Sequence, residues 1–303
     1  MDTHRRSRRY ARTDLPVALA IVGAFLIGCQ PGDFEYRVTG SGTLFGSTVE
    51  RRPGENYQSA TSRTINEFGA LPIVRYFTSG PPDSWPTIRD NVGARPIVVS
   101  FKMAPADVVA GTYDAEVSRW FRMAPSDAPT YWSFHPEPED DIADGSYTAA
   151  EFRAAWSHLA AVARETGNAE LRATLILMCY SLTNASGRDW HDYYPRESDV
   201  DVLAWDCYNH AAEDGRYESP TRLFGAAISL NRRLEKPFAV AEFASTLIPG
   251  DDGTRRASWL VDTAEYLSRH HAVFVTYFDS AVGGAYRLED DPSIAAWRAA
   301  MSR

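Results

Sequence analysis

Two glutamates stand out in this sequence because each is set in or beside a run of apolar residues. Glu137 follows the run TYWSFH, which ends at His135, and Glu242 lies inside FAVAEFAS. A carboxylate is placed in such surroundings only when it is paired or used in chemistry. Two facing carboxyl groups suit cleavage of a glycosidic bond, in which one protonates the leaving oxygen and the other attacks the sugar carbon. We therefore take Glu137 and Glu242 as the candidate catalytic pair.

The two carboxyl groups need different environments for this chemistry. A carboxyl group against apolar walls keeps its proton at neutral pH, whereas one that accepts hydrogen bonds from Arg, Tyr or Asn stays ionised. Tyr208 and Asn209 end another apolar run, and we expect Tyr208 to hydrogen-bond Glu242. The alternative interpretation of Glu242 is a structural salt bridge to Arg75 or Lys102.

The acidic stretch after Glu137 leaves a second candidate acid. Glu139 is that alternative, but Asp140 and Asp141 follow it directly and indicate a solvated loop. We expect the aspartate pair to lie on a loop surface, with a Ca²⁺ site as the less favoured alternative, because carboxylate clusters are its usual ligands.

Polar and aromatic residues near the ends of apolar runs are the candidate substrate contacts: His135, Tyr208, Asn209, Trp190, Trp205, Tyr277 and Arg75. For His135, Tyr208 and Asn209, a satisfied polar residue at a strand end fits the sequence equally well. Trp205 fits core packing equally well, and we expect Trp132 to pack in the core. In the polar loop GRDWHDYYP, Trp190 with Tyr193 and Tyr194 is typical of a sugar-stacking platform.

Eight short apolar runs can position these residues. They begin at Gly42, Pro72, Pro96, Thr130, Ala173, Asp201, Phe238 and Ala272 and extend to Val49, Phe77, Met103, His135, Ser181, Asn209, Ser245 and Asp279. Nearly continuous apolar runs are typical of parallel strands buried on both faces.

Helical patterns fill the intervals between the runs. A capping box at Thr148 and Glu151 opens one helix that stops at Gly167. Other patterns cover 57–68, 83–92, 220–234, 254–270 and 292–301. Alternating strands and helices predict an α/β fold, a (β/α)8 TIM barrel in a single domain, with functional groups at the carboxyl ends of the strands. A doubly wound sheet is the alternative, but no Gly-rich phosphate loop follows the first run.

Composition narrows the possible partners. The chain has 303 residues, a net charge of −9 and a pI near 5.3, which argues against nucleic acid as a partner. The histidines lack the HExxH spacing, no cysteines have a zinc pattern and no GxSxG elbow occurs, so we expect no metal, no cofactor and no serine nucleophile. We expect a monomer.

The first residues have the pattern of an export signal. A basic segment precedes an apolar stretch from Leu15 to Gly28 that is too short to span a bilayer comfortably. The stretch ends in Leu-Ile-Gly-Cys, which resembles a bacterial lipobox, so we expect lipidation at Cys29 and a membrane-anchored protein facing outside the cytoplasm. A signal peptide with a chance cysteine is the alternative, and twin-arginine export is a weaker one. The predicted segments are a signal peptide over 1–28, a tether over 29–39 and a catalytic domain over 40–303.

Two further cysteines remain in the predicted domain. Cys179 and Cys207 both lie in apolar runs, where a disulfide of an exported protein and a pair of buried free thiols are equally compatible with the sequence.

Three motifs carry a family resemblance. Glu137 followed by Pro, Glu242 in AEFAS and the sequence YFDS from Tyr277 resemble the retaining glycoside hydrolases of the large barrel clan, and more narrowly the family 26 β-mannanases. The resemblance implies hydrolysis of a β-mannan-like polysaccharide with net retention, Glu137 as acid/base and Glu242 as nucleophile. In that family a His directly precedes the acid/base, whereas here Pro136 intervenes. A non-catalytic glycan-binding barrel and an enzyme that trims the cell's own surface polymer are the alternatives.

Overall fold

Eight parallel strands close into a barrel in the computed structural model, which describes residues 42–302. The strands are β1 (Leu44–Thr48), β2 (Ile73–Phe77), β3 (Ile97–Phe101), β4 (Thr130–Phe134), β5 (Leu171–Met178), β6 (Val202–Asn209), β7 (Phe238–Ser245) and β8 (Phe274–Tyr277). Each strand pairs with its neighbour in sequence, and β1 pairs with β8. The predicted (β/α)8 barrel is confirmed.

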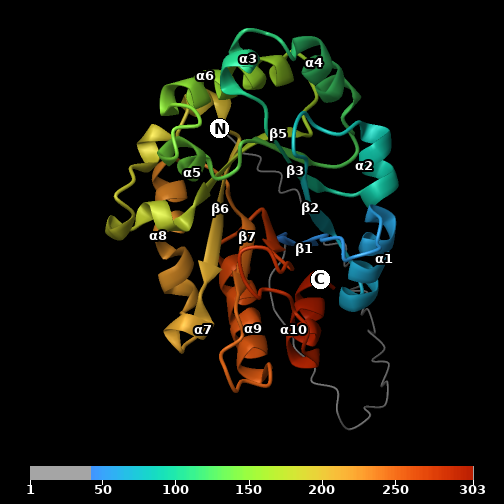
Figure 1. Cartoon of the computed structure of the whole chain (residues 1–303), viewed down its shortest axis with the longest axis vertical. Coiled ribbons are helices and arrows are strands. Elements are labelled where there is room, and N and C mark those ends of the chain that lie inside the picture. Colours follow the sequence, from blue (N-terminus) through green and yellow to red (C-terminus); the bar gives the residue numbers. More distant parts are fainter. Residues whose placement is uncertain (1–41, 303) are drawn as a thin grey trace, which may run out of the picture. The chain divides into compact units, whose positions relative to one another are not determined.

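Helices surround the strands (Figure 1). They are α1 (Tyr57–Phe68), α2 (Trp85–Val92), α3 (Pro105–Val109), α4 (Asp114–Met123), α5 (Pro138–Ala143), α6 (Ala149–Arg164), α7 (Ala211–Asp214), α8 (Pro220–Arg233), α9 (Thr254–Arg269) and α10 (Asp291–Met301). The predicted capping box of Thr148 and Glu151 begins α6. The sequence patterns did not identify α3 and α4, which connect β3 to β4.

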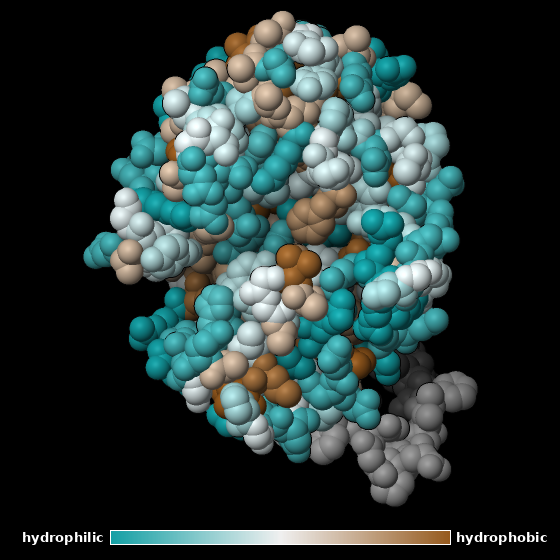
Figure 2. Space-filling view, in the orientation of Figure 1, coloured by the Kyte–Doolittle hydropathy of each residue, from teal (hydrophilic) through white to brown (hydrophobic). Residues whose placement is uncertain are grey.

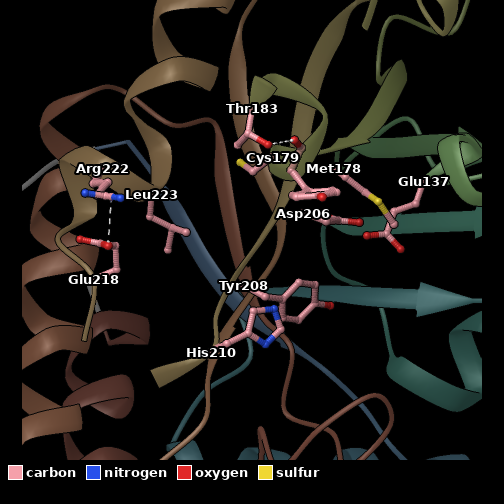
Figure 3. A pocket seen from close by; sticks show the side chains of 11 residues that line it. Glu137, Met178, Cys179, Thr183, Asp206, Tyr208, His210, Glu218, Arg222 and Leu223 are labelled. Atoms are coloured by element: carbon pink, nitrogen blue, oxygen red, sulfur yellow. Dashed lines mark hydrogen bonds and ion pairs between the residues drawn. The ribbon is translucent and has the colours of Figure 1, made fainter. Parts of the chain in front are cut away.

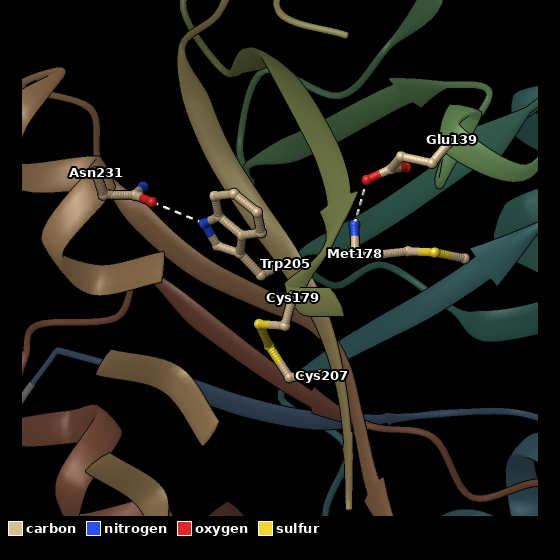
Figure 4. Close-up of a disulfide and its surroundings, with 6 residues drawn as sticks. All are labelled: Glu139, Met178, Cys179, Trp205, Cys207 and Asn231. Atoms are coloured by element: carbon tan, nitrogen blue, oxygen red, sulfur yellow. Dashed lines mark hydrogen bonds between the residues drawn. A yellow bond between two sulfur atoms is a disulfide. The ribbon is translucent and has the colours of Figure 1, made fainter. Parts of the chain in front are cut away.

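The connection from β5 to β6 differs from the predicted alternation of strand and helix. Four 3₁₀ turns occupy it in place of an α-helix: η1 (Cys179–Leu182), η2 (Asn184–Ser186), η3 (Trp190–Asp192) and η4 (Glu197–Asp199). The fifth strand also ends at Met178 rather than Ser181. A disulfide between Cys179 and Cys207 joins η1 to β6 (Figure 4). The cysteines are therefore paired, and the run that contains Cys179 is only partly a strand.

The apolar core has two layers, one inside the barrel and one between strands and helices. The inner layer consists of Ile73, Val98, Tyr131, Ile176, Val202, Ala204, Ala239, Ala241 and Phe274. The outer layer contains the larger set of side chains, including Trp132 and Trp205, both of which are fully buried. The prediction that Trp132 packs in the core is confirmed. The small alanines of β7 inside the barrel leave room near its carboxyl end for polar side chains.

The predicted signal peptide, Cys29 and the tether over 29–39 lie outside the described residues. Within residues 42–302, none of the helices combines the length and the apolar character that a membrane crossing requires.

The disulfide yields the first testable prediction. The bond closes a segment with a sequence separation of 28 residues, and a loop of this size limits the unfolded chain enough to stabilise the fold by about 3.6 kcal/mol. A Cys179→Ser/Cys207→Ser double variant should lose that amount in urea unfolding under non-reducing conditions. Adding a reductant should destabilise the wild-type protein equally and leave the double variant unchanged. Equal midpoints and slopes for both proteins without reductant would contradict the prediction.

Candidate active site

The two candidate catalytic glutamates line one cavity at the carboxyl ends of the strands. This cavity has a volume of about 550 Å³, and we call it the Glu242 cavity. Its other lining residues come from the ends of β1, β2, β3, β4 and β8 and from α1: Thr48, Val49, Glu50, Arg51, Tyr57, Phe77, Lys102, Pro136, Phe278, Ser280 and Val282. Figure 2 shows a mostly hydrophilic face with hydrophobic residues near its middle and another group of them lower down. The cavity thus combines carboxyl groups with apolar and aromatic walls.

Glu137 also lines a second cavity, of about 400 Å³, on the β5 and β6 side (Figure 3). We call it the Tyr208 cavity. It is also lined by Met178, Cys179, Tyr180, Thr183, Asp206, Tyr208, His210, Glu218, Arg222 and Leu223. Because Glu137 belongs to both cavities and Glu242 to one, the acid candidate lies where two binding spaces meet.

Two side chains bind the carboxyl group of Glu242. Arg75 Nη2 lies 3.2 Å from Glu242 Oε1, and the hydroxyl of Tyr208 donates to Oε2 at 2.6 Å. The Arg75 side chain is fully buried, and Glu242 is only 5% exposed. Burial and the charge of Glu242 raise the pKa of Tyr208, so its proton stays on the phenol. The predicted bond from Tyr208 to Glu242 is confirmed, and Arg75 is the partner of this carboxylate.

A β-bulge turns Glu242 toward the barrel interior. Trp205 pairs with Val240, but the next residue of β6, Asp206, pairs with Glu242, so β7 contains one extra residue. Ala241 belongs to the inner layer of the core, and Glu242 directly after it also points inward to Arg75. Bulges redirect side chains in this way, often beside active sites.

Glu137 has the environment of a protonated acid. Burial, followed by the negative charges of Glu242 and Glu139, raises the pKa of Glu137 to about 8. At neutral pH this carboxyl group therefore holds its proton, while Glu242 is paired with a cation. Two carboxyl groups whose environments differ in this way can act as acid and nucleophile in one reaction.

The backbone around Glu137 is in an uncommon conformation. His135 and Glu137 have φ values of 47° and 53°, on either side of Pro136. Left-handed conformations at non-glycine residues cost about 1–3 kcal/mol each and persist where surrounding contacts enforce them. The His135 amide donates to Phe101 O at 3.0 Å, and the Glu137 amide donates to Ile176 O at 3.1 Å.

His135 serves this loop through its own contacts. Its Nε2 donates to Met103 O at 2.8 Å, while Nδ1 lies 3.0 Å from the Tyr147 hydroxyl and 3.1 Å from Asp141 Oδ2. Burial lowers the pKa of His135. Because both ring nitrogens have partners within the protein, His135 positions the Glu137 loop and is not free to bind substrate.

Glu139 was expected in a solvated loop, and that expectation is wrong. The residue is fully buried, and its Oε1 accepts hydrogen bonds from the Met178 amide at 2.8 Å and the Ser181 hydroxyl at 2.9 Å. Burial raises the pKa of Glu139 to about 7. Glu139 lines neither cavity, whereas Glu137 lines both.

Asp140 and Asp141 are engaged in ion pairs. Asp140 contacts Arg188, and Asp141 Oδ2 lies 3.0 Å from Lys102 Nζ. Residues 42–302 contain no group of three His, Cys, Asp or Glu side chains that could hold a metal ion.

Asp206 of β6 is a buried acid that was not among the predicted catalytic or substrate-binding residues. It is 3% exposed and lines the Tyr208 cavity, where it points toward Glu137 (Figure 3). Neither carboxyl oxygen has a hydrogen-bond partner among the described residues. Burial and the charges of Glu242 and Glu137 raise the pKa of Asp206 well above its ordinary value.

Four predicted substrate contacts lie elsewhere. Trp205 and Tyr277 are fully buried, Trp205 donating to Asn231 Oδ1 at 2.7 Å and Tyr277 to Tyr286 O at 2.8 Å. Asn209 is 2% exposed and lines neither cavity. Trp190 packs on His191 and edge-on against Tyr194, also away from both cavities. These side chains support the fold around the site.

Sequence reasoning missed several residues that do line the cavities. Phe77 is 37% exposed, Val282 is 66% exposed, and His210, Glu218 and Arg222 line the Tyr208 cavity. The sequence did contain a signal for Phe77, because this residue ends the apolar run that carries Arg75. In the structure, the Arg75 guanidinium lies 4.0 Å from the centre of the Phe77 ring. Val282 and Arg222 lie outside the strand ends and have no such signal.

The raised pKa of Glu137 generates a prediction about stability. Between pH 4.5, its ordinary pKa, and pH 8, the folded protein holds a proton that the unfolded chain has released. Raising the pH across this window therefore destabilises the wild-type fold, by at most about 1.4 kcal/mol per pH unit for this group.

Glu137→Gln has no proton to lose at this position. Its free energy of unfolding, relative to wild type, should rise through the window and become constant above it, as measured by urea unfolding at several pH values. The exposed Glu116 of α4 provides a matched control, Glu116→Gln, for which the difference should stay flat. A flat difference for Glu137→Gln as well would contradict the assigned environment.

Comparisons with known sequences find limited similarity. No family model matches the chain. The chain is 24% identical over 160 residues to Endoglucanase H from Acetivibrio thermocellus, covering 51% of this chain but only 17% of the endoglucanase.

Solved structures resemble almost the whole described barrel. A glycoside hydrolase family 26 β-mannanase from Bacteroides ovatus matches with a TM-score of 0.54 at 12% identity, over 86% of this chain and 88% of the mannanase. A glucosidase from Croceicoccus marinus matches with a TM-score of 0.59 at 14% identity, over 88% and 69%. A family 128 endo-β-1,3-glucanase from Amycolatopsis mediterranei matches with a TM-score of 0.54 at 17% identity, over 86% and 100%. The chain shares the (β/α)8 fold of these glycoside hydrolases.

Proposed function

We propose that this protein is a glycoside hydrolase that cleaves a β-linked polysaccharide by a retaining double displacement. The observation that carries the proposal is the pairing of Glu137, whose pKa is raised to about 8, with Glu242, which is bound to Arg75 and Tyr208, in one cavity. Such a pair supplies a proton donor and an ionised nucleophile at the same time. The fold shared with glycoside hydrolases supports the reaction class, and the family 26 resemblance favours a β-mannan-like substrate.

The chemistry takes two steps in this proposal. Glu242 attacks the anomeric carbon while Glu137 gives its proton to the glycosidic oxygen, so the old C–O bond breaks as a bond to Glu242 forms. Glu137, now ionised, then takes a proton from water, and the water oxygen displaces Glu242 from the anomeric carbon. One water molecule is consumed, and the two inversions give net retention.

The two cavities fit the two halves of a polysaccharide. The sugar that is attacked must contact Glu242 and therefore occupies the Glu242 cavity, where Phe77, Tyr57 and Phe278 offer apolar faces. The leaving chain must contact Glu137 without Glu242 and therefore occupies the Tyr208 cavity. Substrate on both sides of the cleaved bond is the arrangement expected for internal cleavage.

The test is release of reducing sugar from β-mannans, β-glucans and xylans by the wild-type protein, Glu137→Gln, Glu242→Gln and the control Glu116→Gln. We expect hydrolysis of one polymer, lowered by about 10²- to 10⁴-fold in Glu137→Gln and at least as much in Glu242→Gln. The control should match wild type. NMR of the first product should detect the β-anomer. Glycan binding without release from any polymer, unchanged in both variants, would instead indicate a non-catalytic glycan-binding barrel.

We also propose that the protein is exported and anchored through a lipid on Cys29. The proposal rests on the sequence over 1–29, and the Cys179–Cys207 disulfide supports it, because such bonds persist in oxidising compartments outside the cytoplasm. In bacterial cells, the wild-type protein should sediment with membranes and enter the detergent phase. Cys29→Ser should move to the soluble fraction or remain as an uncleaved precursor. Equal partitioning of both proteins, with the same mass at the mature amino terminus, would contradict the lipid anchor.

A further inference from the structure

The loop that carries Glu137 depends on contacts with β5. Two residues of this loop, His135 and Glu137, are in the left-handed conformation, which relaxes unless neighbouring groups oppose it. The Glu137 amide donates to Ile176 O and is the last backbone hydrogen bond from the loop to β5. The next residue is Pro138, which has no amide hydrogen to continue the pairing.

The side chain of Glu139 makes the next contact with β5, beyond the last backbone hydrogen bond. Its Oε1 accepts from the amide of Met178, two residues beyond Ile176 on β5. It thereby satisfies a backbone donor at the point where the strand ends and η1 begins. Figure 4 shows Glu139 reaching this end of β5, on the side of the strand away from the disulfide.

The same oxygen also binds η1. The hydroxyl of Ser181, 3% exposed, donates to Glu139 Oε1 at 2.9 Å. Cys179 and Tyr180 of η1 line the Tyr208 cavity together with Glu137, and the disulfide from Cys179 fixes η1 to β6. One buried carboxyl oxygen therefore connects the loop that carries the acid with the wall of the cavity assigned to the leaving chain.

We propose that Glu139 is a positioning residue, whose buried side chain fixes the Glu137 loop to η1 and so sets where the proton of Glu137 meets the glycosidic oxygen. This inference rests on the proposed function for its catalytic part. Glu139 touches no substrate in this account and acts only through Glu137 and η1. A misplacement of about 1 Å in an acid of this kind costs about 10²-fold in rate.

The test compares Glu139→Gln with Glu139→Ala. Glutamine keeps an acceptor oxygen for Met178 and Ser181, whereas alanine removes it. Kinetics at a pH of about 5.5, below the pKa of about 7 for Glu139 and about 8 for Glu137, keep both acids protonated, so that loss of charge at position 139 has little effect. Ser181→Ala, which removes one of the two bonds without changing Glu139, provides a second variant if Glu139→Ala folds poorly.

Two substrates separate positioning from general damage. The polysaccharide that the wild type hydrolyses needs the proton of Glu137, but a dinitrophenyl glycoside of the same sugar has a leaving group that departs without it. For Glu139→Ala, kcat/KM on the polysaccharide should fall by about 10- to 100-fold and on the aryl glycoside by less than about 3-fold. Glu139→Gln should stay within about 3-fold of wild type on both substrates, and Ser181→Ala should show a smaller loss confined to the polysaccharide.

Hydrogen exchange gives a measure that does not need activity. Amide exchange over residues 176–183 should accelerate in Glu139→Ala and stay near wild type in Glu139→Gln. Unchanged exchange in Glu139→Ala, or equal losses on both substrates, would overturn the inference. A wild-type protein that hydrolyses neither the polymers nor their aryl glycosides would contradict the proposed function instead, and the exchange data would still decide whether Glu139 holds the loop to η1.

Discussion

The carboxylate of Glu242 is buried at the mouth of the barrel, and this charge requires a partner. Removing an ion from water costs several kcal/mol unless a cation and hydrogen bonds replace the lost hydration. Arg75 from β2 and Tyr208 from β6 supply those contacts. Three strands are therefore tied together at one carboxyl group, next to Glu137 and Asp206, whose carboxyl groups have raised pKa values.

The departures from regular geometry lie around this charge. The bulge in β7 turns Glu242 inward beside Asp206, and the left-handed residues on both sides of Pro136 carry Glu137 over the same opening. Neither feature is favourable on its own. Both persist because contacts from adjacent strands hold them, as Ile176 does for the Glu137 amide. The stability of the regular part of the barrel offsets the free-energy cost of the bulge and of the left-handed residues.

The strands and the pairing of Tyr208 with Glu242 were predictable from the sequence, because apolar runs mark buried parallel strands and the ends of adjacent strands meet at one edge. The bulge was not, since it depends on which residue of β6 faces Glu242 across the sheet. The burial of Glu139 was also hidden. Its neighbours in sequence are acidic, and the groups that bury it, at Met178 and Ser181, lie about forty residues further along the chain.

The central claim is that Glu242 is a nucleophile, and trapping the covalent intermediate tests it most directly. The fluorine of a fluorosugar slows both steps, and a good leaving group restores the rate of the first step. The covalent intermediate therefore accumulates on a retaining enzyme. Mass spectrometry of the peptide that contains FAVAEFAS should find the sugar attached to Glu242. Attachment to another residue, or turnover of the natural polymer to the inverted anomer without any adduct, would contradict the account.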